Sequence, residues 1–244
     1  MSKPMSAPKA PFSFKRHILA PFVGVFIFLS VLGLLNAQWV TAQAQYRFAK
    51  PSLQLSDTFY TGVPETKDPT IYIPKINAQA PVVFDKGTRE DNIQLGLRDG
   101  TVHYDLSAKP GQKGNAVIFG HSSSMPWDSG DYKFIFTLLD KLVMDDKIII
   151  DYDGVRYIYA VTGMHVVTPD DVSVLDQATN DNKLTLITCT PVGSNSKRLI
   201  VQATQISPKP TTTPVTTATK TTPITTTNLP GSSKSFWQSL GDIF

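Results

Sequence analysis

The sequence has little cysteine and little unbalanced charge, and each scarcity excludes a class of protein. Its 244 residues contain one cysteine, Cys189, so no disulfide within the chain can hold the fold together. A lone cysteine is either an inert buried thiol or a reactive one. Of the 23 basic residues, four lie in the first 17 positions, and the remainder of the chain has 19 basic against 20 acidic residues. A nucleic-acid-binding protein carries its basic excess on its folded part, so nucleic acid is not a predicted partner.

Charge is also missing from a long stretch near the N-terminus. Residues 18–40 contain no charged side chain, and Lys15 and Arg16 precede them. As a helix, this run would reach about 34 Å, enough to cross a hydrocarbon core of about 30 Å. Because basic flanks stay inside, we predict a cytoplasmic tail over residues 1–17, a transmembrane helix over 18–40, and an extracytoplasmic remainder at the cell membrane. A signal peptide cleaved near Ala42–Ala44 is the alternative, and it exports the chain equally.

The composition divides the remainder into three parts. Residues 41–68 are polar and irregular, and we predict a spacer. Residues 207–230 contain eleven Thr and five Pro, which cannot build a core, so residues 207–244 are predicted to be a disordered tail. Residues 69–206 are therefore the predicted folded domain.

Strand signals dominate this domain. Short β-type runs, separated by Pro, Gly and Asp-Gly, indicate roughly eight strands and few helices, and so a mainly β barrel or sandwich. The clearest feature is a hairpin in which Asp153-Gly154 forms the turn. Helical spacing predicts one or two turns over 91–97 and a short amphipathic helix over 134–143. The assigned strands are Thr70–Ile73, Ala80–Phe84, Gly114–Gly120, Ile148–Tyr152, Val155–Val167, Leu184–Thr188 and Leu199–Ile206.

The single cysteine stands where a strand ends. An apolar run leads to Cys189, and Pro191 stops the hydrogen-bond ladder directly afterwards. Arg198 follows nine residues later, at the head of the next predicted strand. If the two strands are neighbours, Cys189 and Arg198 lie at adjoining ends of the sheet. Basic charge there favours the thiolate, which is the nucleophilic form.

These residues resemble the sortases. The signature of that family is Thr-Leu-x-Thr-Cys followed one strand later by Arg, and Thr185–Cys189 with Arg198 matches it. The catalytic histidine of the family closes an apolar strand that ends in Gly-His, and Ala116–His121 matches this pattern. The resemblance covers about residues 69–206, and its cysteine motif is similar to that of pilus-type and related sortases. It implies an eight-stranded β-barrel, usually tethered by an N-terminal membrane helix.

The resemblance also implies a cysteine transpeptidase. Such enzymes cleave a C-terminal sorting signal of surface proteins, often Leu-Pro-x-Thr-Gly. They hold the acyl group as a thioester and pass it to an amine of a cell-wall precursor or pilin. Cys189 would be the nucleophile, His121 its proton partner and Arg198 the anion stabiliser. Thr188, beside the nucleophile, is a candidate for substrate binding.

Some family features are missing or altered. Some sortases bind calcium through acidic loops, but Asp170, Asp171, Asp176 and Asp181 have no metal-loop spacing and are interpreted as solvated acids. We therefore predict neither metal nor cofactor. The Asp-Pro-aromatic lid of other sortases is absent ahead of the barrel. Asn228–Ser232 faintly resembles a sorting signal but lacks the Thr-Gly pair, and we interpret it as linker.

Other functions stay open. In a simple cysteine endopeptidase, the same thioester would be hydrolysed by water. A non-enzymatic alternative is an anchored surface binding module with a Thr/Pro stalk. Peptidoglycan L,D-transpeptidases carry a Ser-x-Gly-Cys motif, and Ile187–Cys189 lacks its glycine. The other histidines, His17, His103 and His165, are interpreted as structural.

Overall fold

The computed structural model describes residues 14–35, 44, 67–124, 128, 130–210 and 228–229. The chain forms two compact units, residues 1–41 and 42–244, which are described separately. The first contains helix α1 (Phe14–Leu35), with Pro21 inside it. No helix among the described residues has both the length and the apolarity needed to cross a membrane. The transmembrane span predicted over 18–40 is therefore not shown, and its last five residues lie outside the described part.

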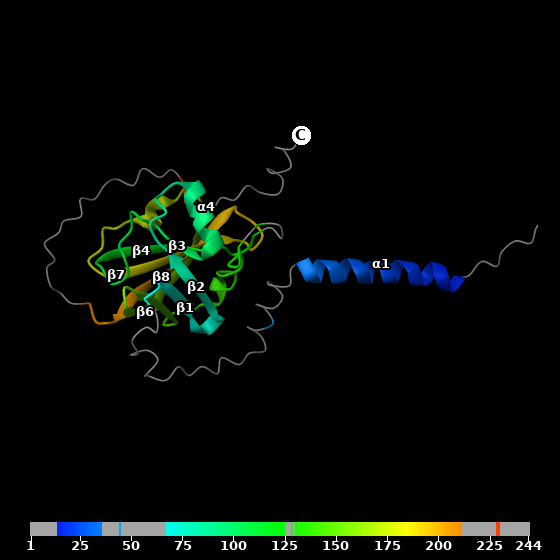
Figure 1. The fold of residues 1–244 in the computed structure, drawn as a ribbon, viewed down its shortest axis with the longest axis horizontal. Helices are drawn as coiled ribbons and strands as arrows, with labels where there is room; N and C mark the ends of the chain where they lie inside the picture. The colour runs from blue at the N-terminus through cyan, green and yellow to red at the C-terminus, as the bar shows by residue number, and fades with distance from the viewer. Residues whose placement is uncertain are drawn as a thin grey trace, which may run out of the picture. The chain divides into compact units, whose positions relative to one another are not determined.

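The second unit contains a closed barrel of eight strands, which confirms the predicted architecture (Figure 1). The strand order around the barrel is β1-β2-β3-β4-β7-β8-β6-β5. Neighbouring strands are antiparallel except for the β2–β3 and β4–β7 pairs, which are parallel. The strands are β1 (Thr70–Ile73), β2 (Ala78–Val83), β3 (Thr101–His103), β4 (Gly114–Phe119), β5 (Lys147–Tyr152), β6 (Val155–Val167), β7 (Asn182–Thr190) and β8 (Lys197–Ser207).

The β5–β6 hairpin forms where the sequence predicts it. Asp153 and Gly154 both have positive φ, at 51° and 74°, as a tight two-residue hairpin turn requires. The strands then pair in register, with Tyr152 opposite Val155 and Asp151 opposite Arg156.

The apolar core has two parts. Side chains from the barrel strands form most of the larger cluster, which also includes Ile76 and apolar residues of the loop before β5. The smaller cluster joins barrel residues to Ile93 and Leu97 of helix α4 (Glu90–Asp99) and to Val174 and Leu175 of the 3-10 helix η3 (Val172–Leu175). Every residue of β4 is buried, as expected for a parallel strand that is covered on both faces. The end of β4 is therefore held in place by close packing on both faces of the strand.

Two local predictions differ from the structure. Strand β3 was not predicted, because three residues carry too little pattern. The helix predicted over 134–143 is wrong: this segment is a series of turns ending in a short 3-10 helix, η2 (Leu139–Lys141). Leu138, Leu139 and Leu142 are nevertheless buried, and Phe134 and Ile135 are half-buried. Phe136 packs so closely on Gly120 that a Cβ there would collide with its ring. The spacing reflected burial in a loop. The remaining short element is the 3-10 helix η1 (Pro74–Ile76).

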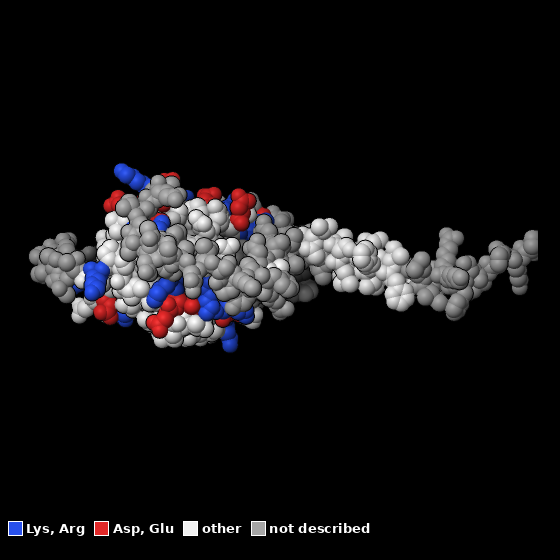
Figure 2. Space-filling view, turned by 90° about the horizontal axis from the view of Figure 1, so that it is seen from below, with Lys and Arg blue, Asp and Glu red and all other residues white. Residues whose placement is uncertain are grey.

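Charged residues of both signs are interspersed over the face of the barrel seen in Figure 2. On this face the described Lys and Arg residues lie beside Asp and Glu residues rather than in a separate field. This distribution agrees with the nearly balanced charge of residues 18–244.

Candidate active site

Strands β4, β7 and β8 bring Cys189, His121 and Arg198 to one end of the barrel. In the antiparallel β7–β8 pair, Cys189 lies directly opposite Arg198. In the parallel β4–β7 pair, Phe119 is aligned with Ile187, and His121 and Cys189 each follow two residues later. The amide of Gly120 donates a hydrogen bond to the carbonyl of Ile187 at 3.1 Å, so the strands remain paired up to the site. The three segments predicted from sequence therefore meet.

Thr188 links the two strand ends. Its hydroxyl donates to the carbonyl oxygen of Gly120 at 2.8 Å, and its side chain is buried. The bond joins the residue before His121 to the residue before Cys189. This arrangement favours a positioning role rather than the substrate contact that the sequence suggested.

Arg198 is the largest fully buried side chain of the described residues. Its Nη1 donates to the carbonyl oxygens of Asn195 at 2.8 Å and Lys197 at 3.1 Å, which fixes the plane of the guanidinium. Its Nη2 donates to the carbonyl oxygen of Leu229 at 3.5 Å. A buried cation is tolerated only when such partners replace its lost hydration. Lys197, the neighbouring cation, is exposed, so Arg198 is the one directed to the site.

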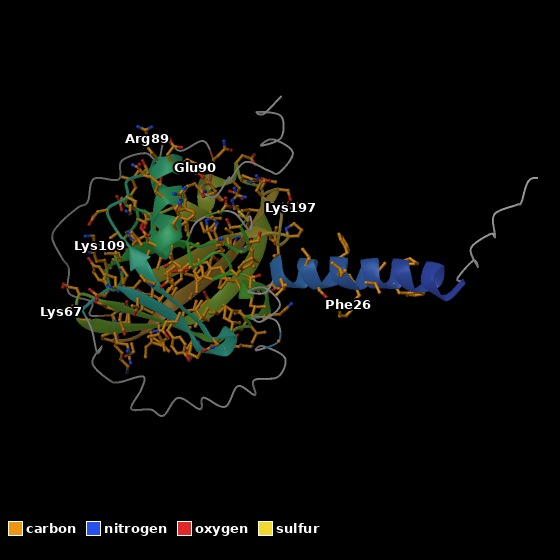
Figure 3. All side chains as sticks on the ribbon, turned by 45° about the vertical axis from the view of Figure 1, so that its right-hand side comes forward. Phe26, Lys67, Arg89, Glu90, Lys109 and Lys197 are labelled. Atoms are coloured by element: carbon orange, nitrogen blue, oxygen red, sulfur yellow. The ribbon has the colours of Figure 1, made fainter. Side chains whose placement is uncertain are left out.

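The Cys189 thiol is half-buried. Its pKa is raised, first because burial disfavours the thiolate; the charge of Arg198 opposes this shift, and the carboxylate of Glu90 adds to it. The charge of Arg198 acts on this pKa in the direction expected from the sequence, but desolvation outweighs it, so the net shift is upward. Glu90 lies at the start of α4, as Figure 3 shows, and no sequence signal connected it with the site.

The imidazole of His121 shifts in the opposite direction. Burial lowers its pKa, and the nearby carboxylate of Asp128 offsets this only in part. With the Cys189 pKa raised and the His121 pKa lowered, both groups are mainly uncharged near neutral pH. A neutral imidazole can accept the thiol proton, so the pair is suited to general base catalysis of a nucleophilic attack.

Hydrogen bonds also join the loops that follow the strands. The amide of Phe136 donates to the carbonyl of His121 at 2.9 Å. The amide of Gly193, in the turn between β7 and β8, donates to the hydroxyl of Ser123 at 2.8 Å. Ser123 was not among the predicted site residues, because a single serine in a polar loop carries no recognisable signal. These bonds hold the histidine loop and the cysteine loop against each other.

The other predicted residues lie elsewhere. His103 is buried, its Nε2 lies 2.9 Å from the carbonyl oxygen of Ala108, and its ring stacks on Phe84 at 4.6 Å. His165 is exposed on β6, and the side chain of His17 lies outside the described residues. Asp171 and Asp176 accept hydrogen bonds from backbone amides of their own loop. Within the described part of the chain, no cluster of three His, Cys, Asp or Glu residues could hold a metal ion.

Comparison with known proteins gives a consistent family. A family model of the Sortase domain matches residues 71–206. Sortase A of Bacillus anthracis is 34% identical over 134 residues, covering 54% of this chain and 56% of that protein. Sortase D of Bacillus subtilis is 28% identical over 138 residues, covering 55% and 62%. The match thus spans little more than half the length of these relatives. Among solved structures, sortase C1 of Streptococcus suis is 27% identical with a TM-score of 0.49, covering 57% of this chain and 73% of that one.

Proposed function

The chain belongs to the sortase family, and on that premise we propose that it is a cysteine transpeptidase acting on surface proteins. The observation that carries the proposal is the cross-strand pair of Cys189 and Arg198, with the segment leading to His121 bonded beside it through Thr188. This arrangement supplies a nucleophile, a proton carrier and a donor for carbonyl oxygen at one end of a rigid barrel.

In the first half of the reaction, His121 takes the proton of the Cys189 thiol, and the sulfur attacks the scissile carbonyl carbon of the substrate. Arg198 donates hydrogen bonds to peptide carbonyl oxygen and stabilises the negative charge that develops. The C–N bond then breaks as His121 returns the proton to the leaving amine. The products are a thioester on Cys189 and the released C-terminal fragment.

In the second half, an incoming amine attacks the thioester carbon. His121 accepts a proton from this amine, the C–S bond breaks, and the sulfur recovers a proton. The acyl group ends in a new amide bond, so the two steps exchange one amide for another without a cofactor. If water attacks instead, the product is a carboxylic acid and the enzyme is a simple endopeptidase.

We propose that the substrate is a C-terminal sorting signal similar to Leu-Pro-x-Thr-Gly, and that the acceptor is an amine of a cell-wall precursor or pilin. Membership of the family supports this chemistry. The direct test incubates the full chain with a peptide library and glycine or a diamine, followed by mass spectrometry. We expect peptides in which the acceptor replaces the released fragment.

The outcomes of this test separate the alternatives. A hydrolysed product alone, with acceptor in excess, would support the endopeptidase. Absence of any cleavage would overturn the enzyme proposal and favour a binding module. Native Cys189 should also react with a small methanethiosulfonate reagent, whereas an inert buried thiol would react only after denaturation.

We further propose that the N-terminal segment attaches the domain to the outer face of the cell membrane. The support comes from the sequence, in which the uncharged run of residues 18–40 follows Lys15 and Arg16. The described helix does not by itself meet the requirements for a membrane span. Protease added to intact protoplasts should release a soluble fragment that contains Cys189. Protection of the barrel until lysis would contradict this orientation.

A further inference from the structure

Leu229 lies in the barrel unit although it is 22 residues beyond the end of β8 in sequence. Its side chain is 1% exposed and belongs to the smaller apolar cluster, together with Val174, Leu175 and Ile200. Asn228, its neighbour, is exposed. The linker interpretation of this segment does not hold at Leu229, since a linker residue stays in solvent rather than in a core.

The backbone of Leu229 is held as firmly as its side chain. Its amide donates to the carbonyl oxygen of Pro169, which follows β6, at 2.6 Å. Its carbonyl oxygen accepts from Nη2 of Arg198 at 3.5 Å. An N–H, a carbonyl and an apolar side chain of one residue are thus all engaged by the barrel. A protein that binds an extended peptide uses this combination of main-chain bonds and a side-chain anchor.

We propose that Leu229 is an intramolecular occupant of the substrate site, which competes with the peptide substrate for Arg198. The proposal rests on the function proposed above, in which Arg198 binds a peptide carbonyl. The two donors that Nη1 directs to Asn195 and Lys197 hold the guanidinium in place, and Leu229 supplies the carbonyl that Nη2 faces. The segment has the Leu-Pro of a sorting signal without its Thr-Gly, so it lacks the bond that the enzyme would cut.

The size of the effect follows from the tether. A segment attached by a short connection reaches an effective concentration on the order of millimolar. For a weak site with a dissociation constant of about 0.1–1 mM, occupation would then raise the apparent KM for an external peptide by about twofold to tenfold. Because the occupant competes only for free enzyme, kcat should not change.

The experiment compares Leu229→Ala and Leu229→Asp with the matched control Asn228→Ser, all in the full chain. We expect both Leu229 variants to show a KM for the sorting peptide that is about twofold to tenfold lower, with unchanged kcat, while the control behaves as wild type. A synthetic peptide of residues 224–234 should inhibit the Leu229→Ala variant competitively. If Leu229 only completes the core, its variants will lower kcat and the thermal midpoint without lowering KM, and the proposal is then wrong.

A binding measurement separates this proposal from the proposed function. The same peptide, carrying a fluorophore, is titrated with each variant, and its anisotropy is recorded. Binding to Leu229→Asp but not to wild type would support the occupant even if no peptide is turned over. Turnover of sorting peptides without binding of the labelled peptide to either chain would keep the enzyme and overturn the occupant. The double variant Arg198→Ala/Leu229→Asp should bind the labelled peptide more weakly than Leu229→Asp alone.

Discussion

Two arginines of the barrel lie in equivalent cross-strand positions and have different surroundings. Arg156 on β6 is opposite Asp151 on β5, and its Nε and Nη2 donate to the two carboxylate oxygens at 2.8 and 2.7 Å. Arg198 on β8 is opposite Cys189 on β7 and donates to backbone carbonyls. Antiparallel pairing sets the spacing of both pairs, so the identity of the opposite residue decides what each arginine does.

The two pairs also differ in their contact with water. The Arg156 and Asp151 side chains each keep 13% of their surface exposed, whereas Arg198 keeps none. The Arg156–Asp151 ion pair is neutral overall and partly hydrated, and it stabilises the β5–β6 hairpin. A fully buried guanidinium beside a thiol acts in a medium of low dielectric constant, where its influence on nearby charge is strong. We therefore propose that the Arg156–Asp151 pair contributes to stability and that the Arg198–Cys189 pair contributes to reactivity.

Removing the thiol should have the largest effect. In Cys189→Ala no residue can form the thioester, so cleavage and the trapped acyl-enzyme should both disappear. The fold should survive, because the cysteine is at a half-buried strand end. Kinetic assays and mass spectrometry of the intact protein check this, and a rate within tenfold of wild type would disprove the cysteine mechanism.

Replacing Arg198 should have the next largest effect. Arg198→Ala should lower kcat/KM by roughly 10²–10³, the cost of one lost oxyanion donor. Arg198→Lys should lose nearly as much, since an ammonium cannot reproduce the planar fork held by Asn195 and Lys197. Single-turnover acylation rates measure the loss. Near wild-type acylation by Arg198→Ala would remove the residue from the mechanism, whereas high activity of the Lys variant alone would reduce its role to charge.

The pH dependence sharpens the contrast. The kcat/KM of the wild type should be greatest between the lowered pKa of His121 and the raised pKa of Cys189, and fall on either side. Arg198 lowers the Cys189 pKa, so removing Arg198 should raise that pKa. The pH at which the thiol becomes reactive to alkylation should then be higher, because each unit by which the pKa rises makes the thiolate fraction about tenfold smaller below the pKa. Alkylation rates across pH measure this. An unchanged profile in Arg198→Ala would show that the arginine does not act on the thiol.

Arg156→Ala should have the smallest effect. It removes a partly exposed bidentate pair at the hairpin, so the free energy of unfolding should fall by about 1 kcal/mol. Its kcat/KM and alkylation profile should match those of wild type, which makes it the control for Arg198. Chemical denaturation and the same kinetic assays provide the measurements. A loss of activity in the folded variant would show that the two arginines are coupled.

Much of this architecture could be predicted because its signals are local. The β5–β6 hairpin depends on Asp153-Gly154, and an apolar run that ends in Cys189 marks its strand without reference to the rest of the chain. The eight residues between Cys189 and Arg198 suffice for a tight connection between neighbouring strands, so this pairing could also be predicted.

The missed features depend on contacts between distant parts of the chain. The raised pKa of Cys189 comes from its burial and from Glu90, almost 100 residues earlier. The loop that replaces the helix over 134–143 is fixed by contacts with Gly120 and His121. The position of Leu229 involves a hydrogen bond from its amide to the carbonyl oxygen of Pro169, 60 residues before it. Composition and periodicity carry no information on such partners.

The parallel pairing of β4 with β7 has a consequence for folding. The bond between Thr188 and Gly120 joins residues that are 68 positions apart, so the chain must close a long loop before it forms. Contacts of such high sequence separation form slowly, and we expect this one to form late, after the local β5–β6 hairpin. Until then His121 and Cys189 are on unconnected segments, and the thiol has the reactivity of an ordinary cysteine. Because Cys189 and His121 come together only when β7 pairs with β4, we expect the proposed catalytic pair to form only after the barrel has closed.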